Sequence, residues 1–286
     1  MRLDGPESQN VEDRRGQGGG GFGRGGVAVG GAIGGVLLVV VAMLLGIDPS
    51  ALLQGEDTAP QQGQLQRQRS PQEDQAGRFA AQVLGETERV WQAEFARMGR
   101  QYQDPVLVLF SGATQSGCGF AQAQMGPFYC PQDHKLYIDL DFMFDLQRRL
   151  GAGGDFASAY IVAHEVGHHV QNLLGVLDRA QQLQGRLNET QGNALQVRIE
   201  LQADCLAGIW ANKAQNARHI LEQGDIEEGL NAAAAVGDDR LQRAAQGRVV
   251  PESFTHGSSA QRVRWFRRGL ESGRLDACDT FTAERL

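Results

Sequence analysis

The stretch Ala163-His164-Glu165-Val166-Gly167-His168-His169 contains the pattern H-E-x-x-H within an apolar run that lacks proline. In a helix, His164 and His168 lie about one turn apart on the same face, where two imidazoles can bind one metal ion. Glu165 is the next residue and can reach a water molecule on that metal. Because so short a pattern also recurs by chance in helical proteins, the rest of the chain must supply a third ligand, a cleft and a suitable compartment.

The residues around this motif predict an α+β fold. Apolar spacing predicts a helix at 79–95 and strands at 106–110 and 135–140. Asp155 can cap the helix that carries the motif, and Gly175 can end it. Further helices are predicted over 176–187, 192–215, 225–236 (with a start like a capping box at Asp225) and 262–270. A small β-sheet followed by a mainly helical bundle is therefore expected.

The composition limits the size of the protein and the class of its partners. The 286 residues are 41% hydrophobic, which is enough for a sizeable core in one or two domains. The net charge is -7, and no basic stripe with interleaved aromatic residues offsets it. No nucleic-acid partner is therefore predicted.

Four segments are expected along the chain. Residues 1–25 are polar and glycine-rich, which predicts a disordered cytoplasmic tail. Residues 26–47 carry no charge, and at about 1.5 Å per residue they can span a hydrocarbon core of roughly 30 Å as one transmembrane anchor. A cleaved signal peptide is the alternative, but its apolar part is shorter, at about 7–15 residues, and no clean cleavage site follows. Residues 48–74 form a linker rich in Gln and Pro, and residues 75–286 form the folded domain.

Basic residues predict the orientation of the anchor. Four arginines precede it, namely Arg2, Arg14, Arg15 and Arg24, and none occurs from 48 to 65. The positive-inside rule then places the N-terminus in the cytoplasm and the folded domain on the periplasmic or extracellular side of the cell (inner) membrane. Gly26, Gly30 and Gly34 form a small-xxx-small face that could pair two anchors in a homodimer, although glycine is common in membrane helices generally.

The four cysteines all follow the apolar run, and an exported domain favours disulfides between them. Cys118 and Cys130 flank a Gly-Pro turn between two candidate strands, so we pair them. Cys205 and Cys278 are then the second pair, which joins the 192–215 helix to the C-terminal tail. A zinc site made of cysteines is disfavoured because the C-x₂-C spacing is absent, and buried free thiols are the remaining alternative.

The third metal ligand does not come from a contiguous three-histidine motif. In the form H-E-x-x-H-x-x-G-x-x-H, the last two defined positions are occupied here by Gln171 and Leu174, so that form is excluded. His169 points about 100° away from His168 on the helix and cannot join the same face. We interpret His169 as a partly exposed surface histidine.

Glu200 and Asp204 are better candidates, because they lie four residues apart in a helix with an otherwise apolar face. One carboxylate can bind the metal while the other accepts the far N–H of a ligand histidine and fixes its tautomer. We assign Glu200 as the ligand and Asp204 as the partner of a ligand histidine. The reverse assignment and a solvated helix edge are the alternatives.

Several motifs together resemble the bacterial neutral zinc metallopeptidase family. They are H-E-V-G-H-H-V-Q and R-I-E-L-Q-A-D-C, preceded by S-G-C-G-F-A and G-P-F-Y-C-P. The similarity covers nearly the whole chain, including the glycine-rich tail and the single anchor. The E-x-x-x-D helix is also similar to that of the wider gluzincin group, in which the first acid binds the metal. The resemblance implies a zincin-like (minimal gluzincin) domain that binds one Zn²⁺ per chain through His164, His168 and Glu200.

The resemblance also implies roles for two later residues. Gluzincin relatives carry a His that is followed six residues later by Arg, and this chain has His256 and Arg262. By resemblance, His256 stabilises the oxyanion and Arg262 helps to arrange the site. Gly257 stands where those relatives usually have Pro, so a helix-start loop with a surface arginine is an equal alternative.

These parts predict a membrane-anchored zinc endopeptidase that acts on polypeptides. Zinc lowers the pKa of its water toward about 7, and Glu165 takes that proton as general base and later delivers it to the leaving amine. A peptide could add as an extended strand along residues 120–125 or 135–140. The alternatives are an envelope chaperone or assembly factor that uses a zincin fold without hydrolysis, and an amidase of cell-wall peptides.

Overall fold

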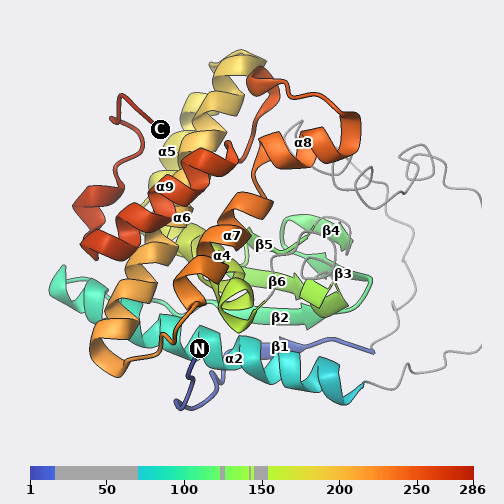
Figure 1. Ribbon diagram of the computed structural model, residues 1–286, viewed down its shortest axis with the longest axis vertical. Coiled ribbons are helices and arrows are strands. Elements are labelled where there is room, and N and C mark those ends of the chain that lie inside the picture. Colours follow the sequence, from blue (N-terminus) through green and yellow to red (C-terminus); the bar gives the residue numbers. More distant parts are fainter. Residues whose placement is uncertain (17–69, 123–125, 142, 145–153) are drawn as a thin grey trace, which may run out of the picture.

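The computed structural model describes residues 1–16, 70–122, 126–141, 143–144 and 154–286. The predicted anchor at 26–47 and the linker up to residue 69 lie outside these ranges. Among the residues that are described, no helix is both long and apolar enough to cross a membrane. The described part is a mixed α+β fold of seven α-helices and two small sheets, as predicted (Figure 1).

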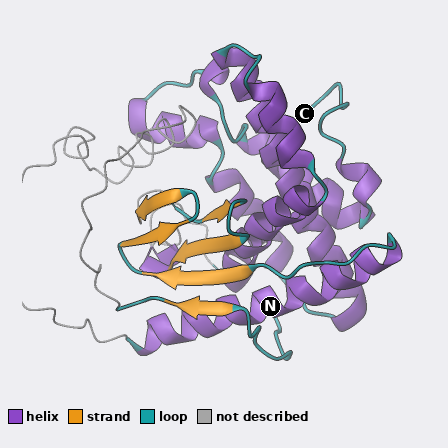
Figure 2. Ribbon diagram, turned by 180° about the vertical axis from the view of Figure 1, so that it is seen from behind, coloured by secondary structure: helices purple, strands orange, loops and turns teal. Residues whose placement is uncertain are grey.

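The larger sheet has four strands in the order β1-β2-β6-β5 (Figure 2). Its strands are β1 (Val11–Asp13), β2 (Val106–Phe110), β5 (Phe128–Cys130) and β6 (Lys135–Asp139). β2 pairs in parallel with both β1 and β6, whereas β5 is antiparallel to β6. β3 (Ala113–Ser116) and β4 (Gly119–Gln122) form a separate hairpin. The strands predicted at 106–110 and 135–140 are confirmed.

The N-terminal segment contradicts the prediction of a disordered tail for residues 1–16. Three of its residues form β1 at the edge of the larger sheet. The polar residues that suggested disorder are used in side-chain contacts, since the buried Arg15 guanidinium donates to the Asp13 carboxylate and to the backbone oxygen of Glu73. Residues 17–25 lie outside the described ranges.

The alternation of side chains along the two central strands separates two layers of core. One face carries Leu107, Leu109, Leu136 and Ile138, which belong to the main core with the helices. The opposite face carries Val108, Phe110 and Tyr137, which pack with Cys130 in a smaller cluster. The helical side of the sheet is therefore the side from which the functional site is built.

Helix α2 (Pro71–Arg97) covers part of that side and runs beside β1 (Figure 1). It begins with a capping box between Ser70 and Glu73, and proline occupies the first turn, where it is tolerated. The stripe predicted at 79–95 forms its inner face, with Trp91 and Phe95 almost fully buried.

The remaining helices form the bundle. They are α4 (Asp155–Leu173), α5 (Val176–Gln184), α6 (Glu189–Arg218), α7 (Asp225–Ala235), α8 (Asp238–Gln246) and α9 (Ser259–Ser272), with 3-10 turns η3 (Pro251–Ser253) and η4 (Leu275–Cys278). α6 packs against both α4 and α9, and α7 packs against α4. The central helix of the bundle is thus α6.

The helix ends differ from the predictions in ways that capping explains. Asp155 and Asp225 are the first residues of their helices, after Gly154 and Gly224, and neither closes a side-chain cap. Their carboxylates instead contact the amino group of Met1. α6 and α9 both begin earlier than predicted, because each has a complete capping box.

Two disulfides join the pairs that the sequence predicted. Cys118–Cys130 ties the β3–β4 hairpin to β5, and Cys205–Cys278 ties α6 to η4. The second disulfide holds the C-terminal segment against the central helix of the bundle.

Candidate metal centre

The H-E-x-x-H motif lies on α4, where this helix approaches α6 closely. A Cβ atom at Gly167 would lie 2.9 Å from the carbonyl oxygen of Ala203, so any side chain there would push the two helices apart. The glycine inside the motif therefore permits the short distance that ligands from two different helices require.

The three predicted metal ligands converge across this contact. Nε2 of His164 lies 3.2 Å and Nε2 of His168 lies 3.4 Å from the same carboxylate oxygen, Oε2 of Glu200. Zinc–nitrogen bonds of about 2.1 Å at tetrahedral angles separate neighbouring ligand atoms by about 3.4 Å. The donor set and its spacing therefore fit one zinc ion, and the group formed by the described residues holds three ligands.

His164 is held by a buried charged network. Its Nδ1 lies 2.9 Å from Oδ1 of Asp204, as the spacing of the two acids predicted. Arg262 of α9 donates from Nε and from one terminal nitrogen to the two Asp204 oxygens, each at 2.9 Å. Tyr160 donates its hydroxyl to Asp204 and accepts from Arg262 at 3.2 Å. Arg262 is thus part of the site and not a surface arginine.

The network changes the pKa values of the ligands before any metal binds. Burial lowers the pKa of His164, but the hydrogen bond and charge of Asp204, with help from Glu200, raise it to about 9. Burial opposes ionisation of Glu200, yet His168 and His164 hold the pKa of its carboxyl well below the usual range. A proton shared by these groups must leave when a metal ion enters.

His168 has a neutral partner, Gln171, which sequence reasoning missed. Nδ1 of His168 lies 2.9 Å from the Gln171 side-chain oxygen, one turn further along α4. Gln171 is fully buried. The only signal in the sequence was that Gln171 follows His168 by three residues and so lies one helical turn away. In the sequence, Gln171 served only to exclude the contiguous three-histidine motif.

Glu165 lies beside the ligands in the same cleft. Burial raises the pKa of its carboxyl, although the neighbouring His164 and His168 oppose this change. A raised pKa moves a carboxylate toward the range in which it can exchange a proton with water near neutral pH. Glu165 is therefore a candidate general base beside the candidate ligands.

His256 approaches the same cleft from the loop before α9. Asp238 holds this loop by accepting the backbone N–H groups of Thr255, His256 and Gly257. Gly257 has a φ of +89°, which proline cannot adopt, so this backbone conformation requires a residue other than the proline of the relatives' pattern. Burial lowers the pKa of His256, but Asp238 and Glu200 raise it above its ordinary value.

A comparison with known families decides how this centre is classified. The model of the family described as "Putative neutral zinc metallopeptidase" matches residues 1–281. The chain belongs to this family. YpfJ of Escherichia coli K12 is 50% identical over 279 residues, and Rv2575 of Mycobacterium tuberculosis H37Rv is 45% identical over 261 residues. The alignments cover 96% and 86% of both chains, respectively, and both relatives are called uncharacterized proteins. No solved structure matches this chain.

The interpretation of His169 as a surface residue was wrong. This neighbour of the zinc-metallopeptidase motif is fully buried, and its Nε2 donates to the backbone oxygen of Gln103 at 2.6 Å. Its Nδ1 lies 3.0 Å from the Tyr129 hydroxyl, and burial lowers the pKa of His169 to about 4. The helix periodicity correctly turned His169 away from the metal, but it turned toward the sheet and not toward solvent.

The metal centre opens into a cleft of about 820 Å³. Phe128 and Tyr129 of β5 line one part of it, and Val236 and Leu241 line another. The predicted edge at 135–140 is wrong, because β6 pairs with β2 on one side and β5 on the other. β4, in the 120–125 segment, pairs with β3 in the separate hairpin. Within the described sheet, β5 is the outer strand nearest the metal centre.

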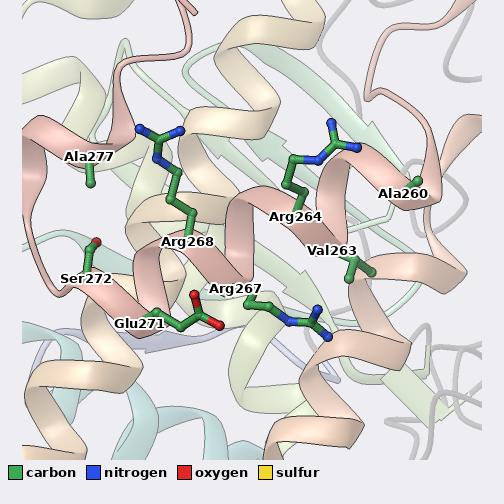
Figure 3. A pocket seen from close by; sticks show the side chains of 8 residues that line it. All are labelled: Ala260, Val263, Arg264, Arg267, Arg268, Glu271, Ser272 and Ala277. Atoms are coloured by element: carbon green, nitrogen blue, oxygen red, sulfur yellow. The ribbon is translucent and has the colours of Figure 1, made fainter. Parts of the chain in front are cut away.

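A second hollow lies over the outer face of α9 (Figure 3). Arg264 and Arg268 point to one side of the helix, and Arg267 and Glu271 lie on the other (Figure 3). Arg268 stacks over the Trp265 ring, with 5.0 Å between its guanidinium carbon and the ring centroid. None of the metal-binding side chains lines this hollow, so it is separate from the metal centre.

Proposed function

We propose that this family member is a zinc-dependent endopeptidase of the gluzincin type that hydrolyses peptide bonds in polypeptides. The observation that carries the proposal is the convergence of His164, His168 and Glu200, with Glu165 beside them in an open cleft. A purely structural zinc site is closed by four protein ligands and needs no adjacent carboxylate. The donor set with an open position is the arrangement that catalytic zinc uses.

The chain's own residues supply the proton transfers. When bound, zinc lowers the pKa of a water molecule and polarises the scissile carbonyl. Glu165 accepts the proton of the attacking water and later delivers it to the leaving amine. His256, with a raised pKa, donates a hydrogen bond to the oxyanion that develops on the carbonyl oxygen. Asp204 and Arg262 keep His164 in the orientation that presents Nε2 to the metal.

We further propose that a substrate binds as an extended strand along β5. This strand lies at the edge of the described sheet, and its residues Phe128 and Tyr129 line the cleft. An added strand gains main-chain hydrogen bonds whatever its sequence, while alternate side chains enter pockets. This mode favours unfolded or flexible segments of polypeptides over compact proteins.

Membrane attachment through residues 26–47 is part of the proposal, and so is an oxidising location for the domain. The support for attachment is the uncharged length of this segment. The support for an oxidising compartment is the pairing of all four cysteines in two disulfides.

Proteomics of the cell envelope tests the proposed activity. Cells with the wild-type chain are compared with cells that carry Glu165→Gln, which keeps the ligands and removes the base. Defined full-length proteins should accumulate in the variant, because hydrolysis falls by roughly 10²–10⁴-fold without a general base. Identical envelope profiles, with a phenotype that Glu165→Gln still complements, would instead support the non-hydrolytic chaperone alternative.

A further inference from the structure

We propose that Gln171 is a positioning residue for zinc, and that Gln202 and the backbone at Cys278 hold it in place. The inference rests on the proposed zinc ligation by His168 and goes beyond it. These groups form a relay of amide hydrogen bonds that runs from the C-terminal segment, through α6, to a ligand on α4. The direction of donation along these hydrogen bonds decides which ring nitrogen of His168 can bind a metal.

The first step is the orientation of the Gln171 amide. Its nitrogen lies 2.8 Å from the backbone oxygen of Ile199, and a carbonyl oxygen can only accept a hydrogen bond. The other end of the amide, the oxygen, must therefore face Nδ1 of His168 at 2.9 Å. That ring nitrogen must carry the hydrogen, so the lone pair of the neutral ring is on Nε2, the atom that faces Glu200.

The second step is the orientation of Gln202, which follows the same logic. Its amide nitrogen donates to the backbone oxygen of Cys278 at 3.0 Å, so its oxygen faces the other way. That oxygen accepts the second N–H of Gln171 at 3.0 Å. A backbone carbonyl thus orients each of the two glutamine amides, and neither can flip without placing two acceptors against each other.

The third step is burial, because no water molecule can take the place of a fully buried side chain in these hydrogen bonds. Gln171 has no exposed surface, so water cannot replace its contact with His168. Without this acceptor, the ring can turn or move its hydrogen to Nε2, and either change removes the metal's lone pair. Loss of an outer hydrogen-bond partner of a zinc ligand reduces metal affinity by about 10–100-fold.

The test compares Gln171→Met with Gln242→Met in the otherwise intact chain. Gln242 is also a buried glutamine, and it makes two hydrogen bonds, to Ser253 and Val250, outside the metal centre. Both variants lose buried hydrogen bonds, so the melting temperatures of both metal-free proteins should be lower than that of the wild type. Zinc affinity, measured by competition with a chelating indicator, should fall about tenfold or more only in Gln171→Met.

A second readout follows the ring directly. In ¹⁵N spectra of the metal-free wild type, Nδ1 of His168 should carry a hydrogen, and Gln171→Met should add a form in which Nδ1 carries none. Equal zinc affinities for Gln171→Met and Gln242→Met, with an unchanged His168 tautomer, would overturn the inference. A wild-type chain that binds no zinc would instead overturn the proposed function on which it rests.

An independent observation carries a second inference, on topology. We infer that residues 1–16 and 70–286 occupy the same side of the membrane. β1 pairs in parallel with β2, and the flanking residues Asn10 and Arg14 exchange backbone hydrogen bonds with β2. The Ser8 N–H donates to the backbone oxygen of Ala81 in α2 at 3.0 Å. A single membrane crossing between residues 16 and 70 would place these hydrogen-bonded partners in different compartments. The inference therefore keeps the proposed membrane attachment through residues 26–47 but replaces the single crossing predicted from the sequence.

The surface of α2 is shaped to receive the N-terminal segment. A Cβ atom at Gly85 would lie 2.9 Å from the backbone oxygen of Pro6, and one at Gly77 would lie 3.1 Å from the guanidinium of Arg15. Glu12 also forms an ion pair with Lys135 of β6. Arg14 and Arg15, two of the four arginines that precede the apolar run, are paired within the fold with Glu12 and Asp13, so their charges count less toward a cytoplasmic N-terminus.

Labelling with a membrane-impermeant maleimide in intact cells tests the topology. Single cysteines are introduced at Gln9 and Thr190, which are both exposed, and labelling is measured over that of the parent chain. Labelling of both positions before lysis, or of both only after lysis, is the expected result. Labelling of one before lysis and of the other only afterwards would overturn the inference and restore the predicted single-pass orientation.

Discussion

The two histidine ligands occupy adjacent turns of one helix, but the groups that orient them differ in charge. His164 is oriented by a buried carboxylate that is itself paired with the Arg262 guanidinium. His168 is oriented by the neutral amide of Gln171. Removing one partner of a buried ion pair strongly destabilises the fold, because the other charge stays buried. Removing a buried amide leaves only its hydrogen-bond partners unsatisfied. Substitutions in the charged network around His164 should therefore destabilise the protein more than substitutions around His168.

The largest effect is expected from Arg262→Met, which removes the guanidinium that contacts both oxygens of the buried Asp204 carboxylate and leaves only His164 beside this charge. The free energy of unfolding of the metal-free protein should fall by about 3–5 kcal/mol. Denaturant unfolding monitored by circular dichroism measures this change. A smaller loss of unfolding free energy in Arg262→Met than in Gln171→Met would show that the charged network around His164 is not the more sensitive of the two.

The pH dependence of zinc binding should also reveal the His164 side. Because the pKa of His164 is raised to about 9 in the metal-free protein, zinc must displace a proton at neutral pH. Apparent zinc affinity should therefore rise about tenfold per pH unit from neutral pH and level off near pH 9. Calorimetry in two buffers of different ionisation enthalpy counts the released proton, and Asp204→Asn should lower the pH at which affinity levels off.

A smaller loss of stability is expected on the His168 side. Gln171→Met should lower the free energy of unfolding by about 1–3 kcal/mol, because it leaves buried partners unsatisfied but no uncompensated charge. The same denaturant titration applies, with Gln242→Met as the matched variant. A loss as large as that of Arg262→Met would show that the amide relay supports the fold as much as the charged network does.

The smallest effect should come from Tyr160→Phe, which removes one hydroxyl from the charged network. Asp204 keeps both bonds to Arg262, so the free energy of unfolding should fall by only about 0.5–1.5 kcal/mol. Zinc affinity, measured by chelator competition, should change by a few-fold at most. A loss of zinc binding in this variant would mean that the hydroxyl, and not Arg262, fixes Asp204.

The ligands on both helices could be predicted from sequence because their spacing is local. His164 and His168, and likewise Glu200 and Asp204, each lie four residues apart on one helix, so helix periodicity alone groups them. The two pairs could be assigned to one site because two histidines alone leave a zinc site short of a third ligand, which a carboxylate can supply. The disulfide pairs were predicted for a similar reason, since choosing the Cys118–Cys130 pair left only one other.

The parts that were missed depend on contacts between distant segments. The two acceptors of the Gln171 amide hydrogens belong to residues 28 and 31 positions away, and they meet Gln171 only because α4 and α6 are in close contact. His169 is buried by Tyr129 and by the backbone of Gln103, which no helical pattern reveals. β1 has only three residues, two of them acidic, so it shows no strand alternation, and an ion pair between Glu12 and Lys135 links it to β6.

The central claim is that zinc held by His164, His168 and Glu200 serves hydrolysis with Glu165 as the base. The most direct measurement is the rate at which the purified full-length chain cleaves an unstructured polypeptide, for wild type and Glu165→Gln at equal zinc occupancy. The account predicts cleavage by the wild type and a rate lower by roughly 10²–10⁴-fold in the variant. Equal rates at equal zinc occupancy, or no cleavage by the zinc-loaded wild type, would contradict it.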